Sequence, residues 1–160
     1  MNPEVQGKAG WQMFYNRLLL IAFLSWLGSV LIKAVINLII NKKFVWNRFL
    51  GDGGMPSNHS SVVCSLATGA GLMGGWNSPL FAVTVVLALI VMHDAVGVRQ
   101  ETGKQAKVIN NMLKLFESMG RGELTPTETL KEFVGHTGRQ VAVGALWGVL
   151  SAAALHALLP

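Results

Sequence analysis

Charged residues are scarce in this sequence. Only 13% of its 160 residues are charged, whereas about a quarter are charged in an average soluble domain. Apolar residues make up 51% and the mean hydropathy is +0.45. The core of a soluble domain of 160 residues is too small to bury this much apolar surface. The composition therefore argues against an ordinary soluble domain and indicates a membrane protein.

Cysteine and acidic residues are also few, and each shortage argues against a class of site. The one cysteine, Cys64, cannot form an internal disulfide, and we expect it to pack as a small hydrophobe in an apolar segment. Only eight residues are acidic, and no aspartate follows Asp94. So few carboxylates argue against a site with two divalent metal ions. We therefore expect no metal and no other cofactor.

The sequence instead contains long apolar segments. Four of them are near the roughly 20 residues that cross a bilayer as a helix: residues 18–40, 60–76, 79–98 and 141–159. The first is too long for the apolar part of a cleavable signal. We predict an all-α fold, a polytopic membrane helix bundle of about four transmembrane helices that forms a single domain over residues 1–160. So thin a bundle is compatible with a homodimer.

Basic residues are distributed unevenly over the two sides of such a bundle. One side holds Lys8 and Arg17, and the other holds ten basic residues: Lys42, Lys43, Arg48, Arg99, Lys104, Lys107, Lys114, Arg121, Lys131 and Arg139. The positive-inside rule puts the ten in the cytoplasm and both termini outside, in what we expect to be the plasma (inner) membrane. Because this basic surface lies against the membrane, we expect anionic lipid and not nucleic acid as its partner.

The segment between the third and fourth spans is too long to lack structure. Apolar residues recur in it at helical spacing: Ala106, Ile109, Leu113 and Phe116. This pattern predicts a cytoplasmic amphipathic helix that lies along the membrane or against the bundle. Residues 125–128 have the pattern of a capping box with Pro126 at the first helical position, which predicts a short capped helix that ends at Gly135.

Pairs of glycines four residues apart occur in two of the predicted spans. They are Gly71 and Gly75 in the second span, and Gly144 and Gly148 in the fourth. Such spacing is typical of membrane helices that pack closely. We expect these two spans to approach each other, which would bring together the helix starts that carry His59 and His136.

His59 and His136 are candidate catalytic residues because each lies where an apolar helix begins. His136 precedes Thr137, a predicted cap that Gln140 completes as a capping box. A helix N-terminus offers free N–H groups and a positive dipole end, which suits a phosphate and disfavours imidazolium. A neutral imidazole can attack phosphorus while a second one protonates the leaving oxygen. Alternatively, both are ordinary interfacial histidines.

Hydroxyls, an amide and cations near these helix starts are candidate phosphate ligands: Ser57, Asn58, Ser60, Arg99, Lys42, Lys43 and Arg48. Asp94 is a third catalytic candidate, because acidic residues inside membrane spans are costly. We expect Asp94 to pair with His136 or Arg99, either as an orienting carboxylate or as a structural ion pair. Lys33, in the first span, is expected to neutralise a carboxylate.

Several motifs together resemble a known family. The run Pro56-Ser57-Asn58-His59-Ser60 resembles the Pro-Ser-Gly-His signature of type 2 phosphatidic acid phosphatases (PAP2) and vanadium haloperoxidases. Over roughly residues 18–148 the chain is more similar to the divergent PAP2 family, the acid phosphatase/vanadium-dependent haloperoxidase-related membrane proteins. The residues that carry this similarity are Gly53–Ser60, His93–Arg99, Gly103–Ala106, Asn110, Leu130–Glu132 and Gly135–Thr137.

This resemblance implies a lipid phosphatase in which His136 becomes a phosphohistidine and His59 protonates the leaving group. It also implies that Ser57 and the adjacent N–H groups hold phosphate oxygens. The chain departs from the pattern at Gln140, where the family has an acid that orients the nucleophile. Leu130 replaces an arginine, and the first PAP2 motif is absent because Lys42 and Arg48 are six residues apart instead of seven.

Two functions are therefore predicted. One is a metal-independent phosphatase for a lipid phosphate monoester. The other is a non-catalytic membrane protein that binds or transports a phospholipid or polyprenyl phosphate. Residues 94–99 also resemble a stretch of the CDP-alcohol phosphotransferases, but those enzymes need several aspartates to hold metal, which this chain lacks.

Overall fold

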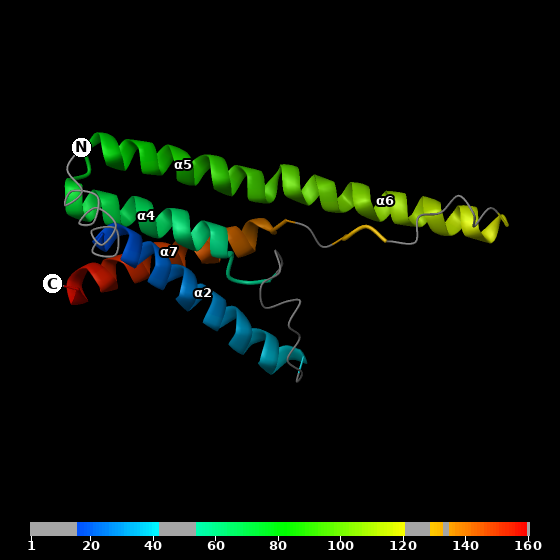
Figure 1. Cartoon of the computed structure of the whole chain (residues 1–160), viewed down its shortest axis with the longest axis horizontal. Helices are drawn as coiled ribbons and strands as arrows, with labels where there is room; N and C mark the ends of the chain where they lie inside the picture. Colours follow the sequence, from blue (N-terminus) through cyan, green and yellow to red (C-terminus); the bar gives the residue numbers. More distant parts are fainter. Residues whose placement is uncertain (1–15, 42–53, 121–128, 133–134, 160) are drawn as a thin grey trace, which may run out of the picture.

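The computed structural model describes residues 16–41, 54–120, 129–132 and 135–159. Within these ranges the chain forms helices and no strand. The helices are α2 (Arg17–Asn41), α4 (Asn58–Gly74), α5 (Pro79–Val96), α6 (Val98–Ser118) and α7 (Gly138–Leu158). Four of them lie side by side, while α6 extends away from the others beyond the end of α5 (Figure 1). The prediction of an all-α helix bundle is confirmed.

Three stretches of the described chain are long and apolar enough to cross a membrane: Arg17–Ile39, Pro79–Ser118 and Gly138–Leu158. The second stretch runs through α5 and α6. Large apolar side chains cover the outside of α5, where Val83 is 64% exposed and Ile90 is 62% exposed. Lipid solvates such a surface better than water does. With 17 residues α4 is about 26 Å long, which is shorter than the roughly 30 Å of bilayer hydrocarbon. Its crossing of the bilayer therefore stays a prediction.

The helix α4 is the centre of the bundle, because it packs against α2, α5 and α7. On the side toward α5, Val63, Cys64 and Ala88 form a small apolar core. Between α2 and α7, hydrogen bonds join the helices. The hydroxyl of Ser151 donates to Ser25 Oγ at 2.8 Å, and Trp147 Nε1 donates to Ser25 O at 3.0 Å. Lipid offers no hydrogen bonds, so these polar groups satisfy one another.

The closest packing in the bundle joins α4 to α7 at two glycines. A Cβ at Gly144 would lie 2.5 Å from Ser57 O, and one at Gly148 would overlap Ser61 O. The predicted approach of these two helices is therefore confirmed at the α7 glycines. It is wrong for the other pair: Gly71 lies under the ring of Trp76, and Gly75 ends α4 with φ of +91°. There the chain turns back toward α5, so the aromatic ring fills the space.

The predicted amphipathic helix is present as α6, but it does not pack against the bundle. Gly97, with ψ of −88°, separates α5 from α6, and in the described chain α6 contacts no helix other than α5. The two helices follow each other in nearly the same direction (Figure 1). The expected contact with the bundle is therefore wrong, because α6 continues the line of α5. A position of α6 along the membrane remains a prediction.

The predicted short helix before Gly135 is not found in its described part. Residues 129–132 belong to no helix. The backbone N–H and C=O of Leu130 both bond to the side chain of Asn110 on α6, so neither is available to a helix. The proposed capping box at residues 125–128 lies outside the described residues.

The α4–α7 contact yields a test with a clear sign. Replacing a helical glycine by alanine normally stabilises a helix by about 1 kcal/mol. We expect Gly148→Ala to do the opposite and lower the free energy of unfolding by about 1–3 kcal/mol, because the new methyl group meets the α4 backbone. Thermal unfolding in detergent measures this change. The control Gly138→Ala makes the same substitution on α7 where nothing lies within 4 Å of the Cβ position, and it should not lower the midpoint.

Candidate active site

His59 and His136 face each other although 76 positions separate them in the sequence. His59 lies in the first turn of α4, and His136 lies just before α7 begins. Their ring centroids are 6.1 Å apart and the ring planes are inclined by 57°. His136 is only 3% exposed, while His59 is partly buried. An imidazole nitrogen contacts a hydrogen-bonded atom at about 3 Å, so both rings can contact one small group placed between them.

A backbone hydrogen bond fixes the start of α4 on the first turn of α7. The N–H of Ser57 donates to the carbonyl oxygen of Gln140 at 3.1 Å. This approach is possible because Gly144, one turn further along α7, has no side chain where Ser57 lies. The distance between the histidines is therefore set by the backbone of Ser57 and by the absence of a side chain at Gly144.

The Ser57 and Ser60 hydroxyls, predicted phosphate ligands, bond to each other in the structure. Ser60 Oγ donates to Ser57 Oγ at 3.0 Å, and Ser57 Oγ also accepts from the N–H of Ser60 at 3.4 Å. Both residues are completely buried. Ser57 is thus the N-cap of α4. A helix leaves its first N–H groups without partners inside the helix, so the amides of Asn58 and His59 are the ones that α4 offers to an anion.

The side chain of Asn58 is held by Ser29, which was not among the predicted site residues. Its side-chain oxygen lies 3.1 Å from the hydroxyl of Ser29 on α2, which is fully buried. Serines at positions 25 and 29, one helical turn apart in an apolar span, were the available signal. They form the polar face by which α2 meets α4 and α7.

The start of α7 is capped as predicted. Thr137 Oγ1 accepts from the N–H of Gln140 at 3.4 Å, and Gln140 Oε1 accepts from the N–H of Thr137 at 2.9 Å. The side-chain oxygen of Gln140 is therefore engaged in a capping box. This contact explains a glutamine at the position where the resemblance led us to look for an orienting acid.

His136 is attached by its backbone to the junction between α5 and α6. Its N–H donates to Ala95 O at 3.0 Å. Gly135 has φ of +90°, and a Cβ there would lie 2.6 Å from the backbone nitrogen of Gln100. The starts of α4 and α7 therefore meet at the two histidines, next to the α5–α6 junction. Each of these two helix starts carries about half a positive charge, so this end of the bundle is suited to an anion.

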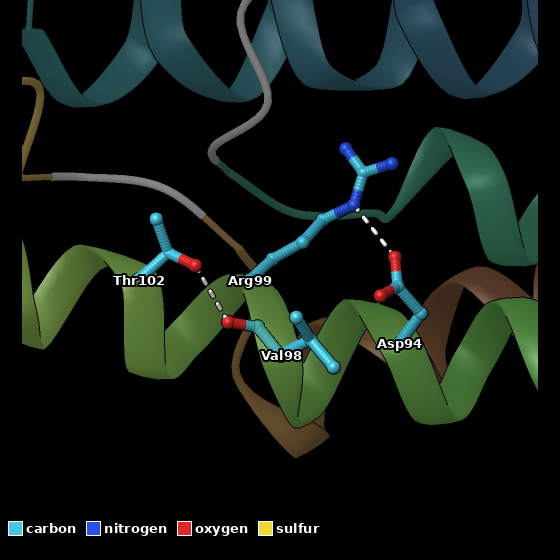
Figure 2. Close-up of polar contacts among 4 residues, drawn as sticks. All are labelled: Asp94, Val98, Arg99 and Thr102. Atoms are coloured by element: carbon cyan, nitrogen blue, oxygen red, sulfur yellow. Dashed lines mark hydrogen bonds and ion pairs between the residues drawn. The ribbon is translucent and has the colours of Figure 1, made fainter.

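Asp94 pairs with Arg99 across the same junction. Arg99 Nε donates to Asp94 Oδ2 at 2.8 Å, and the terminal guanidinium nitrogens point away from Asp94 (Figure 2). Both side chains are more than 40% exposed, and ion pairs this exposed add at most about 1 kcal/mol to stability. The contact therefore orients Arg99 more than it stabilises the fold. Of the two partners expected for Asp94, Arg99 is the one observed.

Lys33, which was expected to neutralise a carboxylate, is buried on α2. Lys33 is 2% exposed, and its aliphatic carbons lie 3.6 Å from where a Cβ of Gly54 would be. Lys42, Lys43 and Arg48 lie outside the described residues. Within the described ranges, no three histidine, cysteine or acidic side chains gather closely enough to hold a metal ion.

Comparisons with known proteins identify a family. The family model described as "Divergent PAP2 family" matches residues 14–151. The uncharacterized membrane protein YuiD of Bacillus subtilis (strain 168) is 36% identical over 147 residues, which cover 87% of this chain and 93% of that protein. No solved structure gives a significant match.

Gly135 provides a test of how His136 is held. We expect Gly135→Ala to displace this segment, because alanine is strained at φ of +90° and its methyl group meets the backbone of Gln100. Hydrogen exchange of the His136 amide, which donates to Ala95, should become at least about tenfold faster. Gly138→Ala is the matched control, since nothing lies within 4 Å of its Cβ position. Equal exchange in the two variants would contradict this account.

Proposed function

Because the chain belongs to the divergent PAP2 family, we propose that it is a membrane-embedded phosphatase that hydrolyses a lipid phosphate monoester without a metal ion. The observation that carries the proposal is the facing pair of His59 and His136 at the meeting point of helix starts, with ring centroids 6.1 Å apart. A phosphoryl group held between these rings has a nucleophile on one side and a proton donor on the other.

In the first step a nitrogen of neutral His136 attacks phosphorus. The N–P bond forms while the bond from phosphorus to the lipid oxygen breaks. His59, which starts as imidazolium, gives a proton to that oxygen and becomes neutral. The products are a lipid alcohol and phosphohistidine at His136. In the second step, neutral His59 takes a proton from water, the water oxygen attacks phosphorus, and the N–P bond breaks. Inorganic phosphate leaves and both histidines return to their starting protonation states.

Charge stabilisation comes from the surrounding helix starts. The transferring phosphoryl group gathers negative charge on its equatorial oxygens, which need fixed donors around them. The first amides of α4, at Asn58 and His59, are suited to this role. Arg99 would add a guanidinium clamp, with Asp94 setting its direction through Nε. Asp94 is then a positioning residue for Arg99, and the buried Ser57 supports the site as the cap of α4.

A lipid is the substrate that fits the site's place in the molecule. The histidines lie where apolar helices of the bundle begin, and the headgroups of a bilayer lie next to its hydrocarbon. The excess of basic residues in the connections at this end supports a cytoplasmic orientation of the site. Phosphatidic acid, lysophosphatidic acid and polyprenyl phosphates share the required monoester.

The phosphatase proposal is tested by measuring phosphate released by purified protein from each of these lipids in EDTA. We expect His136→Ala and His59→Ala each to reduce kcat by at least about 100-fold, since both bond-making steps need these groups. His156→Ala is the control, because His156 lies near the other end of α7. Undiminished release by both site variants would refute the mechanism.

A second function is favoured by one observation. The side-chain oxygen of Gln140 is engaged in the cap of α7, and a glutamine provides no negative charge to stabilise an imidazolium at His136. Without such charge the same site could bind or transport a phospholipid or polyprenyl phosphate without turnover.

Binding and turnover can be separated through Arg99. If the protein is a phosphatase, Arg99→Ala should lower kcat/KM by about 10- to 100-fold, because a bidentate charged contact is lost, and release should remain measurable. If it is a binding protein, wild type will retain labelled phosphatidic acid without releasing phosphate, and Arg99→Ala will weaken retention. Lys104→Ala is the control, since Lys104 is an exposed cation paired with Glu101.

A further inference from the structure

Asn110 is a buried amide on a helix that is otherwise mostly exposed. Its side chain lies on α6, where its neighbours Ile109 and Asn111 are both exposed, yet Asn110 itself is only 5% exposed. Burying an amide is unfavourable unless its hydrogen bonds are satisfied. The groups that satisfy Asn110 all belong to the segment that leads toward His136.

The amide binds this segment at three points. Asn110 Nδ2 donates to Leu130 O and to Glu132 Oε1, each at 2.9 Å, and the N–H of Leu130 donates to Asn110 Oδ1 at 3.0 Å. One side chain thus takes both backbone groups of Leu130, as a neighbouring β-strand would. Such a pair of bonds fixes both the place and the direction of the chain at residue 130.

A second attachment lies at the other end of the same helix. Gly135 packs on the backbone of Arg99 and Gln100, and the N–H of His136 bonds to Ala95. The ten helical residues from Gln100 to Asn110 extend about 15 Å. The five residues from Leu130 to Gly135 can reach about 18 Å at most. Because only a few residues join the two attachments, we expect a shift at Leu130 to reach Gly135 and His136.

We propose that Asn110 is a positioning residue that holds His136 opposite His59 by fixing residues 130–132 on α6. The effect on turnover rests on the phosphatase activity proposed above, while the effect on position does not. Asn110 lies about ten residues along α6 from the junction and acts only through the segment that it holds. A misplacement of about 1 Å in a reacting group can cost about 100-fold in rate.

The neighbouring asparagine makes a matched experiment possible. Asn110→Ala removes all three bonds, whereas Asn111→Ala removes the same amide from an exposed position on the same helix. We expect Asn110→Ala to lower kcat for phosphate release by about tenfold or more and to leave KM within about twofold, since the amides of α4 and Arg99 still bind phosphate. Asn111→Ala should match wild type. Equal kcat in both variants and wild type overturns the proposal.

Hydrogen exchange of the His136 amide tests the positioning role of Asn110 independently of the proposed phosphatase activity. If wild type releases no phosphate, the phosphatase proposal fails, but Asn110→Ala should still speed hydrogen exchange at His136 and Asn111→Ala should not. Unchanged exchange in Asn110→Ala overturns the positioning role whatever the activity. Thermal unfolding midpoints close to wild type exclude general loss of structure as the cause.

A charge-neutral rescue guards against a variant that fails to fold. Asn110→Asp keeps an acceptor for the N–H of Leu130 but sets two carboxylates together at Glu132, so kcat should fall. Adding Glu132→Gln supplies an amide donor to the new carboxylate and keeps the total charge of wild type. The double variant should recover about threefold or more in kcat relative to Asn110→Asp alone. An absence of recovery together with normal exchange at His136 contradicts the proposal.

Discussion

The contact between α4 and α7 is possible only because Gly144 and Gly148 have no side chains. Without a Cβ at these positions, the backbone of Ser57 and Ser61 lies directly on α7. In lipid the hydrophobic effect does not drive helices together, so close backbone packing and hydrogen bonds do. The bond from the Ser57 amide to Gln140 follows from this approach, and with it the distance between the two histidines.

The electrostatics of the site follow from the same packing. Two helices, α4 and α7, begin at the same end of the bundle, and their dipoles add there. Buried serines hold α2 against this arrangement through hydrogen bonds that lipid cannot replace. The result is a polar end on an apolar bundle, built mostly from backbone groups and from hydroxyls that bond to each other. Arg99 and Asp94 contribute charge at its edge.

Local features of the structure could be predicted from the sequence, while pairing across long separations mostly could not. The lengths of the apolar segments located the helices of the bundle, and helical periodicity located α6. The Thr137–Gln140 capping box was predicted because it needs residues only three apart. Gly71 and Gly144 have the same spacing pattern, and only the turn that places Trp76 over Gly71 distinguishes them. The burial of Asn110 could not be predicted, since its partner Leu130 is 20 residues away. The prediction of a short helix before Gly135 failed for the same reason.

Gly97 interrupts the helix between α5 and α6, and this interruption limits which residues can replace it. In an unbroken α-helix the carbonyl of Ala95 would accept the N–H of Arg99, yet here it accepts the N–H of His136. The irregular turn thus frees an acceptor for a neighbouring segment. A residue with higher helix propensity at position 97 would favour a continuous α5–α6 rod and compete for that carbonyl. Selection for stability and selection for the site therefore oppose each other at this glycine.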